Sequence, residues 1–241
     1  LTACYTVLMV LYRRGWHMQQ TFKVPEGPVP VTGISIVIPA RDEAANIGAC
    51  IRSILAQDYP KELFEVIVID DHSTDNTIDI VRSFANERVQ CISLADHIQP
   101  GEVVTAYKKK ALSVAIAQSM GALIVTTDAD CTMHAKWLNN VAAIYEQKNP
   151  VMIVAPVDYV CDASLLQLFQ SIDFMSMQGI TAATHRLKLG NMSNGANLAC
   201  SKEGYLKVGG YAGIDHLASG DDSLLMMELQ QTYPLKVSYL K

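Results

Sequence analysis

Two carboxylates stand close together after a short apolar run in the middle of the chain. Asp128 and Asp130 are one residue apart and follow residues 122–126. Carboxylates gathered in one place repel each other, so a cation must offset that cost. A hard divalent ion that also binds a diphosphate is the natural partner, because Mg²⁺ commonly takes one or two carboxylates plus phosphate oxygens. We therefore expect Asp128 and Asp130 to bind a metal or a ligand.

Polar residues also follow two earlier apolar runs, at residues 34–38 and 64–69. The candidates are Pro39, Arg41 and Glu43 after the first run, and Asp70, Asp71 and Asp75 after the second. Asp75 stands just before Asn76 and Thr77. Because Asp, Asn and Thr commonly cap helices, we expect Asp75 to cap the helix that follows.

The sequence lacks the glycine motifs that bind phosphate through backbone amides. No GxGxxG follows the first run and no GxxxxGK[ST] is present, so a dinucleotide Rossmann site is unsupported and a P-loop is excluded. The charge of a phosphate would then be met by a metal and by lysine or arginine. Lys108 and Lys110 are the lysine candidates, and the alternative for both is a solvated helix start.

The elements around these residues determine where they lie. Apolar runs alternate with segments of helical periodicity. Strands are expected at 34–39, 64–69, 89–94, 122–126 and 151–155, and helices at 43–57, 77–84, 111–120, 137–145, 163–184 and 222–231. Residues 190–220, rich in Gly and Asn, are expected to form irregular loops around a short strand and a helix. Strands that are apolar throughout are covered on both faces, which indicates an α/β fold with a mainly parallel sheet between helix layers. Such sheets bind ligands at the carboxyl ends of their strands, where the candidates stand.

Length and composition set limits on the class of protein. The chain has 241 residues, of which 50% are apolar and 18% are charged, so we expect a sizeable core in one large domain or at most two small ones. A formal net charge of -5 argues against a nucleic-acid partner. The six cysteines are dispersed and form no CxxC pair, so we expect reduced thiols in a reducing compartment rather than a disulfide framework or zinc site.

Residues 1–20 are expected to form a membrane-anchor or juxtamembrane segment. Residues 1–12 are almost wholly apolar and are followed by Arg13 and Arg14. A bilayer needs roughly 20 apolar residues, so we interpret this run, which begins with Leu, as the end of a truncated transmembrane helix. The positive-inside rule then places the two arginines, and everything after them, on the cytoplasmic side. The alternative is a buried or interfacial helix of a soluble protein. Residues 21–33 contain three prolines and are expected to be an extended linker.

Six strings, in this order and spacing, resemble a family 2 glycosyltransferase with the GT-A fold. They are ISIVIPARDE, VIVIDDHSTDNT, KKKALS, IVTTDADC, SNGANLACSKEGYLKVGGY and SGDDSLLMMEL. The resemblance runs over residues 34–241 and implies a Rossmann-like three-layer α/β/α sandwich. It further implies that residues 34–131 bind the nucleotide sugar, that residues 132–241 bind the acceptor, and that the chain is part of a truncated membrane-anchored member.

On the donor side, the resemblance assigns five residues to the nucleoside. Pro39, Arg41 and Glu43 are similar to the residues that line its pocket. Asp71 matches the carboxylate that faces uracil or another base, with Asp70 beside it.

On the reaction side, the resemblance assigns a lysine, a metal and a base. Lys108 matches a lysine near the nucleotide. Asp128 and Asp130 are similar to the family's DxD motif, in which the second carboxylate reaches Mn²⁺ or Mg²⁺ and the first touches the sugar or ribose. Asp222, which follows Asp221, matches the general base.

The chain departs from the family pattern at two places. The family commonly has Glu-Asp where this chain has Asp221 and Asp222, and the shorter first side chain puts its reach in doubt. The family's lysine often follows glycine, whereas Tyr107 precedes Lys108 here, which leaves Lys110 as a rival.

The resemblance implies a metal-dependent, inverting transfer of a sugar from a nucleoside diphosphate sugar, with a UDP-sugar expected, to an acceptor hydroxyl. The expected cofactor is Mn²⁺ or Mg²⁺, and the expected acceptor is a lipid or a cell-envelope polysaccharide. One alternative is a sugar nucleotidyltransferase, although such enzymes usually carry a glycine-rich signature where this chain has residues 40–43. The other is a non-catalytic nucleotide-binding scaffold domain.

Three further features have two interpretations each. Trp137 could stack on a sugar, but we expect a core aromatic. The Met-rich segment 163–184 could pack in the core or lie against a membrane, and we expect core packing with a membrane-facing edge. His72 has no metal-ligand spacing and is expected to be an ordinary loop residue.

Overall fold

A seven-stranded sheet runs through the centre of the computed structural model, which describes residues 1–24, 29–84, 88–161, 164–190 and 192–241. The strand order is β3-β2-β1-β4-β6-β5-β7. The strands are β1 (Ile34–Ala40), β2 (Phe64–Asp70), β3 (Val89–Ser93), β4 (Leu123–Thr126), β5 (Met152–Val154), β6 (Leu198–Ser201) and β7 (Val237–Tyr239). The five strands predicted by residue range are confirmed, β6 is the short strand expected within residues 190–220, and β7 is an additional strand that the sequence analysis did not predict.

Most strand pairs of the sheet are parallel. β1 pairs in parallel with β2 and β4, β2 with β3, and β5 with β7. β6 is antiparallel to both of its neighbours, β4 and β5. The predicted mainly parallel sheet is therefore confirmed, and the carboxyl ends of β1, β2 and β4 lie side by side at one edge.

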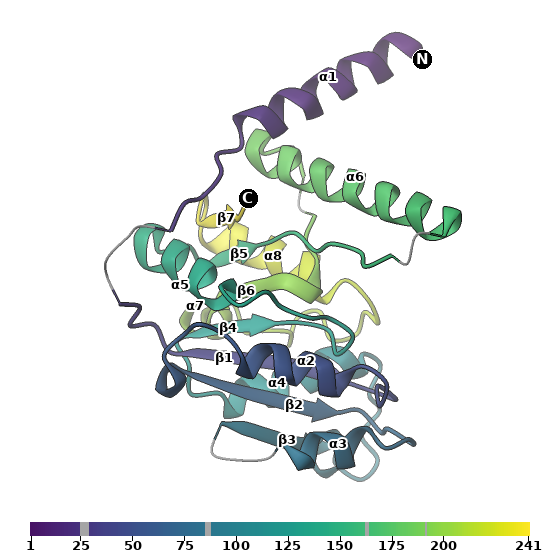
Figure 1. Cartoon of the computed structure of the whole chain (residues 1–241), viewed down its shortest axis with the longest axis vertical. Coiled ribbons are helices and arrows are strands. Elements are labelled where there is room, and N and C mark those ends of the chain that lie inside the picture. Colours follow the sequence, from purple (N-terminus) through teal and green to yellow (C-terminus); the bar gives the residue numbers. More distant parts are fainter. Residues whose placement is uncertain (25–28, 85–87, 162–163, 191) are drawn as a thin grey trace.

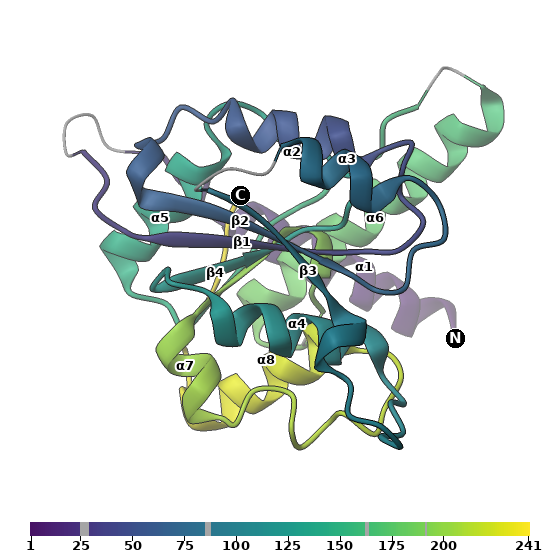
Figure 2. The ribbon, with the colours of Figure 1, turned by 90° about the horizontal axis from the view of Figure 1, so that it is seen from below.

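Helices cover both faces of the sheet (Figures 1 and 2). The helices are α1 (Thr2–Met18), α2 (Ile47–Leu55), α3 (Thr77–Ser83), α4 (Tyr107–Gln118), α5 (Trp137–Lys148), α6 (Leu165–Leu187), α7 (Lys202–Lys207) and α8 (Asp221–Thr232). In Figure 2, α2, α3 and α5 lie on one face, and α4, α7 and α8 lie on the other. The predicted three-layer α/β/α arrangement is confirmed.

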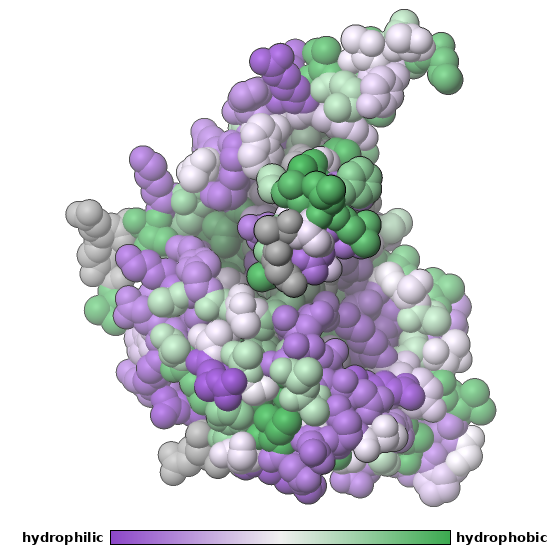
Figure 3. Space-filling model, turned by 45° about the vertical axis from the view of Figure 1, so that its right-hand side comes forward, coloured by the Kyte–Doolittle hydropathy of each residue, from purple (hydrophilic) through white to green (hydrophobic). Residues whose placement is uncertain are grey.

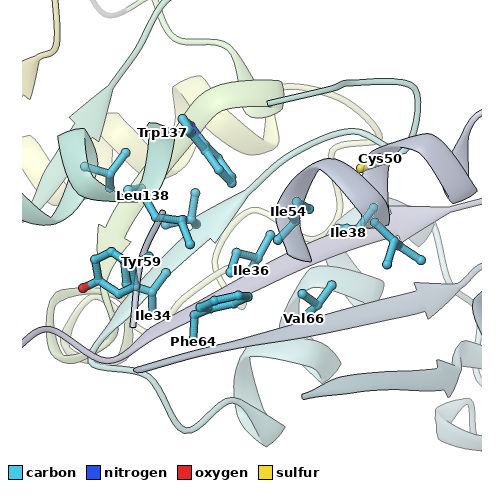
Figure 4. Packing of buried hydrophobic residues seen from close by; sticks show 14 of the residues in the cluster. Ile34, Ile36, Ile38, Cys50, Ile54, Tyr59, Phe64, Val66, Trp137 and Leu138 are labelled. Atoms are coloured by element: carbon cyan, nitrogen blue, oxygen red, sulfur yellow. The ribbon is translucent and has the colours of Figure 1, made fainter. Parts of the chain in front are cut away.

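Side-chain alternation along β1 explains why this strand is apolar except at Ser35, whose buried hydroxyl donates to Glu65 at 2.6 Å. Ile36 and Ile38 pack with Ile54 and Trp137 on the α2 and α5 face (Figure 4). Val37 points to the opposite face, where it joins the core formed with α4 and α8. Successive residues of a strand face opposite sides of a sheet, so a strand buried on both sides needs apolar residues at nearly every position.

Two helices begin at other residues than the periodicity predicts. The helix expected from Glu43 begins at Ile47, because residues 43–46 form turns that lead away from the strand end. The helix expected from Ala111 begins at Tyr107, so all three lysines of residues 108–110 lie in its first turn. This earlier start fixes the directions in which the three lysines point.

α1 and α6 pack against each other at the end of the molecule remote from β3 (Figure 1). Their backbones approach closely at Gly15, where a Cβ atom would lie 2.7 Å from the carbonyl oxygen of Ala183. Residues 181–184 of α6 are buried, which agrees with the expected core packing, but residues 165–177 carry many exposed apolar side chains. Core packing therefore holds for the second half of α6, and the membrane-facing edge stays a prediction for the exposed first half.

Hydrophobic surface gathers over the first half of α6 and over α1 (Figure 3). Among the described residues, no helix combines the length and the apolar character that a membrane span requires. The expected linker of residues 21–33 lies partly outside the described residues, at 25–28. Of its described part, Phe22 donates a backbone hydrogen bond to the carbonyl oxygen of Lys241.

Candidate active site

A pocket of about 340 Å³ lies at the carboxyl ends of β1, β2 and β4, and we call it the strand-end pocket. It is lined by Pro39, Ala40, Arg41, Glu43, Asp71, Lys108, Ala111, Asp128, Ala129 and Asp130. Seven of the eleven predicted site residues therefore come together here. A larger hollow of about 520 Å³ lies at the opposite strand ends, near Gly33 and Gly121, and none of the predicted residues lines it. The chemistry therefore points to the smaller pocket.

The loops after β1 and β2 are joined by hydrogen bonds. The carboxylate of Asp42 accepts from the backbone N–H of Thr74 at 2.7 Å. The carboxylate of Asp75 accepts from the backbone N–H groups of Thr77 at 2.9 Å and Ala44 at 3.0 Å. Asp75 thus caps the start of α3, as expected, and it also binds the loop after β1 through Ala44. These bonds hold the rim of the strand-end pocket in place before any ligand binds.

Asp71 is paired with a histidine that the sequence analysis set aside. The Nδ1 atom of His72 lies 2.8 Å from a carboxylate oxygen of Asp71. The ring of His72 meets the ring of Tyr107 edge to face, at 5.6 Å between centroids. His72 has a φ of 59°, a left-handed conformation that is uncommon outside glycine, Asn, Asp and His. His72 is therefore a neighbour of the strand-end pocket, and only its position beside Asp71 could have indicated this.

Asp70 lies beneath the strand-end pocket and does not line it. Its side chain is 3% exposed, and one carboxylate oxygen accepts from the backbone N–H of Ser73 at 3.3 Å. The other oxygen, Oδ1, has no hydrogen-bond partner among the described residues. Buried carboxylate oxygens usually have partners, but Asp70 is not among the residues that line the strand-end pocket with Asp128 and Asp130.

The three lysines at the start of α4 point in three directions. Lys108 faces the strand-end pocket, where its Nζ lies 3.0 Å from Oδ1 of Asp128 and 3.9 Å from Oδ2 of Asp221. Lys110 instead pairs with Glu102, at 2.7 Å. Burial by itself would lower the pKa of Lys108, but the carboxylates of Asp128 and Asp221 outweigh it and raise that pKa above its usual value. Of the two rivals, Lys108 is therefore the lysine at the pocket.

Asp221 and Asp222, which we call the acid pair, stand at the start of α8. Gly220 precedes them with a φ of 74°, a left-handed conformation that suits glycine. Asp221 reaches towards Lys108, and Oδ1 of Asp222 accepts from the backbone N–H of Ser223 at 2.7 Å. A helix N-terminus favours negative charge, so this position stabilises both carboxylates. The acid pair does not line the strand-end pocket but lies beside it.

Gly195 borders the acid pair, although the sequence analysis gave it no role of its own. A Cβ atom on Gly195 would lie 3.5 Å from Oδ2 of Asp221 and 3.8 Å from Nζ of Lys108. The carbonyl oxygen of Gly195 accepts from the hydroxyl of Thr126 at 2.8 Å. The loop before β6 therefore completes the wall between the acid pair and β4.

The residues of the strand-end pocket fit a divalent cation that is shared with a ligand. Asp128 and Asp130 both line the pocket. Among the described residues, no three His, Cys, Asp or Glu side chains form a group that could hold a metal by themselves. Mg²⁺ and similar hard cations commonly take one or two carboxylates and complete their shell with phosphate oxygens and water.

Cys131 is close to the two aspartates but suits a hard cation poorly. Its Sγ lies 3.6 Å from Oδ1 of Asp130. Burial, and after it the charge of Asp130, raises the pKa of the Cys131 thiol to about 11. At neutral pH the thiol of Cys131 is therefore protonated. Since the thiolate is the form that binds metals, Cys131 is a neighbour of Asp130 rather than a metal ligand.

Trp137 belongs to the core rather than to the pocket surface. It is 3% exposed, and its indole N–H donates to Oδ1 of Asn197 at 3.0 Å. Asn197 in turn donates to the carbonyl oxygen of Pro156 at 2.8 Å. The expectation of a core aromatic is therefore confirmed, and Trp137 ties α5 to the loop that borders the acid pair.

Comparison with known sequences gives matches to one family. The profile of the family described as Glycosyl transferase family 2 matches residues 35–196. The glycosyltransferase AglE of Haloferax volcanii is 28% identical over 189 residues, which are 78% of this chain and 58% of AglE. The poly(ribitol-phosphate) beta-N-acetylglucosaminyltransferase TarS of Staphylococcus aureus is 30% identical over 121 residues, which are 50% of this chain and 20% of TarS. The chain thus spans less than two thirds of the length of these relatives.

Comparison with solved structures gives the same fold. The mannosyltransferase PcManGT from Pyrobaculum calidifontis, solved in complex with GDP-Man and Mn²⁺, has a TM-score of 0.72 at 21% identity, and the likeness covers 99% of this chain and 63% of PcManGT. TarS 1–349 from S. aureus, solved in complex with UDP-GlcNAc, has a TM-score of 0.61 at 20% identity, covering 86% of this chain and 56% of that chain. The expected GT-A fold is therefore confirmed.

Proposed function

Since the chain belongs to glycosyltransferase family 2, we propose that it transfers a sugar from a nucleoside diphosphate sugar, a UDP-sugar, to an acceptor hydroxyl with inversion at the anomeric carbon. One observation carries the proposal. Lys108 reaches Asp128 on the donor side and Asp221 of the acid pair from a single position. The leaving diphosphate and the attacking hydroxyl would therefore both lie close to Lys108, on opposite sides of the anomeric carbon.

The strand-end pocket would bind the nucleoside diphosphate. Pro39, Arg41 and Glu43 would surround the nucleoside, and Asp71 would accept an N–H of its base. A base that binds there has to displace His72 from Asp71 or share that carboxylate with it. Lys108 would then exchange part of its contact with Asp128 for the phosphate charge. Two related structures contain nucleotide sugars, GDP-Man in PcManGT and UDP-GlcNAc in TarS, which supports a donor of this chemical class.

Asp128 and Asp130 would hold Mn²⁺ or Mg²⁺ together with the diphosphate. The bound cation would act as a Lewis acid that stabilises the charge of the leaving diphosphate. PcManGT was solved with Mn²⁺. The protonated Lys108, beside Asp128, would add a second positive charge at the leaving group.

Asp222 would act as the general base. Its carboxylate would take the proton of the acceptor hydroxyl while the acceptor oxygen bonds to the anomeric carbon and the bond from that carbon to the diphosphate breaks. Asp221 is turned towards Lys108, which leaves Asp222 as the member of the acid pair for the acceptor. Gly195 would leave space there, since it places no side chain against the acid pair.

The test is donor binding and turnover by the purified protein. We expect UDP-sugars with Mn²⁺ to raise the melting temperature, because a ligand that binds only the native state stabilises it. We expect release of UDP in the presence of an acceptor. A sugar nucleotidyltransferase would instead release pyrophosphate from a nucleoside triphosphate and a sugar phosphate. A scaffold domain would bind the donor without turnover, and either result would overturn the proposal.

We also propose that the protein docks on a membrane through α1 and α6 and transfers the sugar to a lipid or cell-envelope saccharide. The apolar side chains of Leu165, Leu166, Phe169, Ile172 and Met175 are each more than half exposed. Exposed Arg13, Arg14, Arg186 and Lys188 lie where α1 and α6 end. Exposed apolar residues, with basic residues near the C-terminal ends of the same two helices, suit the interface of an anionic bilayer. The positive-inside rule would place the catalytic domain on the cytoplasmic side.

Co-sedimentation with vesicles tests this docking. We expect wild-type protein to sediment with vesicles rich in phosphatidylglycerol and the Phe169→Glu, Ile172→Glu double variant to remain largely in the supernatant. Val103 is 90% exposed and far from α6 in sequence, so Val103→Glu is the matched control and should sediment like wild type. Equal sedimentation of all three proteins would contradict docking through α6.

A further inference from the structure

Lys109 is a buried cation that the proposed reaction leaves without a role. Its side chain is 1% exposed, and it is among the largest fully buried side chains of the described residues. Its Nζ donates to the backbone carbonyl oxygens of Ile214 at 3.0 Å, Leu217 at 2.6 Å and Ser219 at 2.9 Å. An ammonium has three donor hydrogens, so these three bonds use all of them. Because a buried charge is costly unless it is hydrogen-bonded, the three carbonyls and the ammonium require each other.

The three carbonyls belong to the segment that delivers the acid pair. Residues 208–220, which we call the α7–α8 loop, join α7 to α8. Near its start, Gly209 and Gly210 have positive φ values of 80° and 59°, and its last residue, Gly220, has a φ of 74°. Tyr211 and Ile214 anchor its first half in the core. Its second half, residues 215–219, is exposed, and there Lys109 binds the carbonyls of Leu217 and Ser219.

The same turn of α4 also faces the strand-end pocket. Lys108 lies 3.0 Å from Asp128 and 3.9 Å from Asp221, while the next residue, Lys109, holds the loop that ends at Gly220. α4 is itself packed on β1 and β2, the strands that carry the nucleoside side of the pocket. The first turn of α4 therefore connects the pocket and the acid pair through two adjacent lysines.

We propose that Lys109 is a positioning residue that holds the α7–α8 loop and thereby sets the place of the acid pair relative to the bound donor. This inference rests on the proposed function for its effect on transfer. The contact of Lys109 with the loop does not depend on any ligand. Its loss should leave the residues of the strand-end pocket in place and displace only the start of α8.

The experiment replaces Lys109 in the full-length protein by methionine, which has similar length and no donor hydrogens. We expect Lys109→Met to keep the dissociation constant of UDP with Mn²⁺ within about threefold of wild type, while kcat falls at least tenfold. Lys110→Met is the matched control, because Lys110 is the next residue in the same turn and pairs with Glu102 at the surface. It should change neither quantity by more than about twofold. A Lys109→Met protein with unchanged kcat, or with donor affinity and kcat lowered together, would overturn the proposal.

A double-mutant cycle separates positioning from a general loss of structure. If Lys109 acts through the acid pair, Lys109→Met should cause little further loss of kcat in an Asp222→Asn background. Losses that multiply in full would show that Lys109 acts elsewhere and would overturn the proposal. If Lys109→Met does not fold, Gly220→Ala strains the same junction from the other side, since Gly220 has a φ of 74°. Gly220→Ala should likewise lower kcat and leave the affinity for UDP with Mn²⁺ unchanged.

Hydrogen exchange tests the contact without any need for activity. Lys109→Met should speed exchange at the amides of residues 214–222 and leave the amides of β1, β2 and β4 protected. Lys110→Met should leave both regions as in wild type. If the wild-type protein shows no transfer, the proposed function fails while this readout still tests the loop contact. If transfer is present and exchange at 214–222 is unchanged, the positioning role fails on its own.

Discussion

The strand-end pocket and the acid pair place their carboxylates by different means. Asp71 and Asp128 follow β2 and β4, which flank β1 in the same parallel part of the sheet. The sheet itself therefore brings them together, and each loop needs only a few residues. Asp221 and Asp222 follow an irregular loop of 13 residues, 208–220, and the strand β6 that precedes α7 is antiparallel to its neighbours. The acid pair depends on contacts from another part of the chain.

The strand-end pocket is formed by the topology of the sheet, whereas the position of the acid pair is fixed by side-chain contacts. Loops after parallel strands meet at one edge in any sheet of this kind. Lys109 binds the loop that leads to the acid pair, and Asp221 of that pair lies 3.9 Å from Lys108. We therefore expect substitutions at the strand ends to affect donor binding and reaction together, and substitutions around α8 to affect the reaction alone.

The largest effect is expected for Asp130→Asn. Without this carboxylate the cation and the diphosphate would both be held poorly, and metal stabilisation of charge is worth several kcal/mol. Each 1.36 kcal/mol is a factor of ten in rate, so kcat/KM should fall by at least about 10⁴-fold, and Mn²⁺ should no longer strengthen UDP binding. Isothermal titration of UDP with and without Mn²⁺ checks the binding part.

Asp96→Asn is the matched control for that change, because Asp96 is an exposed acid that does not line the strand-end pocket. It should keep wild-type kcat/KM. If Asp130→Asn retained Mn²⁺-dependent binding of UDP, Asp130 would not hold the metal. The assignment of donor and metal binding to the strand-end pocket would then be wrong.

Asp222→Asn should have the next largest effect, and on the reaction alone. A positioned base contributes about 10²–10⁴-fold, so kcat should fall within that range while the dissociation constant of UDP with Mn²⁺ stays at the wild-type value. Single-turnover assays with a saturating donor measure this. Asp221→Asn is the informative neighbour, since Asp221 faces Lys108 at 3.9 Å. A larger loss of kcat for Asp221→Asn than for Asp222→Asn would exchange the roles of the two residues.

Lys108→Met should weaken both regions moderately, because Lys108 contacts Asp128 and faces Asp221. A hydrogen bond to a charged group contributes about 1.5–3 kcal/mol, so UDP should bind about 10–100-fold more weakly. Lys110→Met, which loses only the surface pair with Glu102, should bind UDP normally. Equal weakening by both variants would show that net charge, rather than the position of Lys108, governs donor binding.

The pH dependence sharpens the assignment of Lys108. The carboxylates around it outweigh the effect of burial and raise its pKa above the ordinary value, which is about 10.4. A group with a raised pKa makes its contribution in full below the unfolded pKa and loses it only as the pH rises through the folded pKa. Between pH 6 and pH 9, the ratio of wild-type to Lys108→Met affinity for UDP should therefore be constant. A ratio that falls within this window would show that Lys108 loses its proton there.

The sequence predicted the strand-end pocket better than the rest of the site, for a physical reason. The strands β1, β2 and β4 are buried on both faces. An apolar run in the sequence therefore indicates each strand, and the polar residues after the run indicate where the strand ends. β7 escaped prediction because it is only three residues long, Val237–Tyr239, and two of its residues are half-buried. The first half of α6 has the composition of a core helix, and sequence periodicity does not tell which partner covers such a helix.

The lysine run shows where prediction from sequence ends. Successive helical residues point about 100° apart, so three identical side chains acquire three functions only once the start of the helix is known. α4 begins at Tyr107, not at the predicted Ala111, and this sends Lys109 into the core. Its partners lie more than 100 residues later, at Ile214 and Leu217. Every residue has a backbone carbonyl, so the sequence does not indicate which carbonyls a buried lysine binds.

The smallest effect is expected for Trp137→Phe, which tests whether the wall beside the acid pair is structural. The substitution removes the indole donor that binds Asn197 at 3.0 Å, and it leaves a smaller ring in a site that is 3% exposed. A lost hydrogen bond of this kind costs about 1 kcal/mol, which for a domain of this size corresponds to a melting temperature lower by about 2–4 °C. Donor affinity and kcat should change less than threefold, since the indole does not line the strand-end pocket. Scanning calorimetry and donor titration measure the two quantities. A tenfold loss of kcat with an unchanged melting temperature would mean that the indole contacts the substrate, and the loop around Gly195 would then belong to the chemistry rather than to its support.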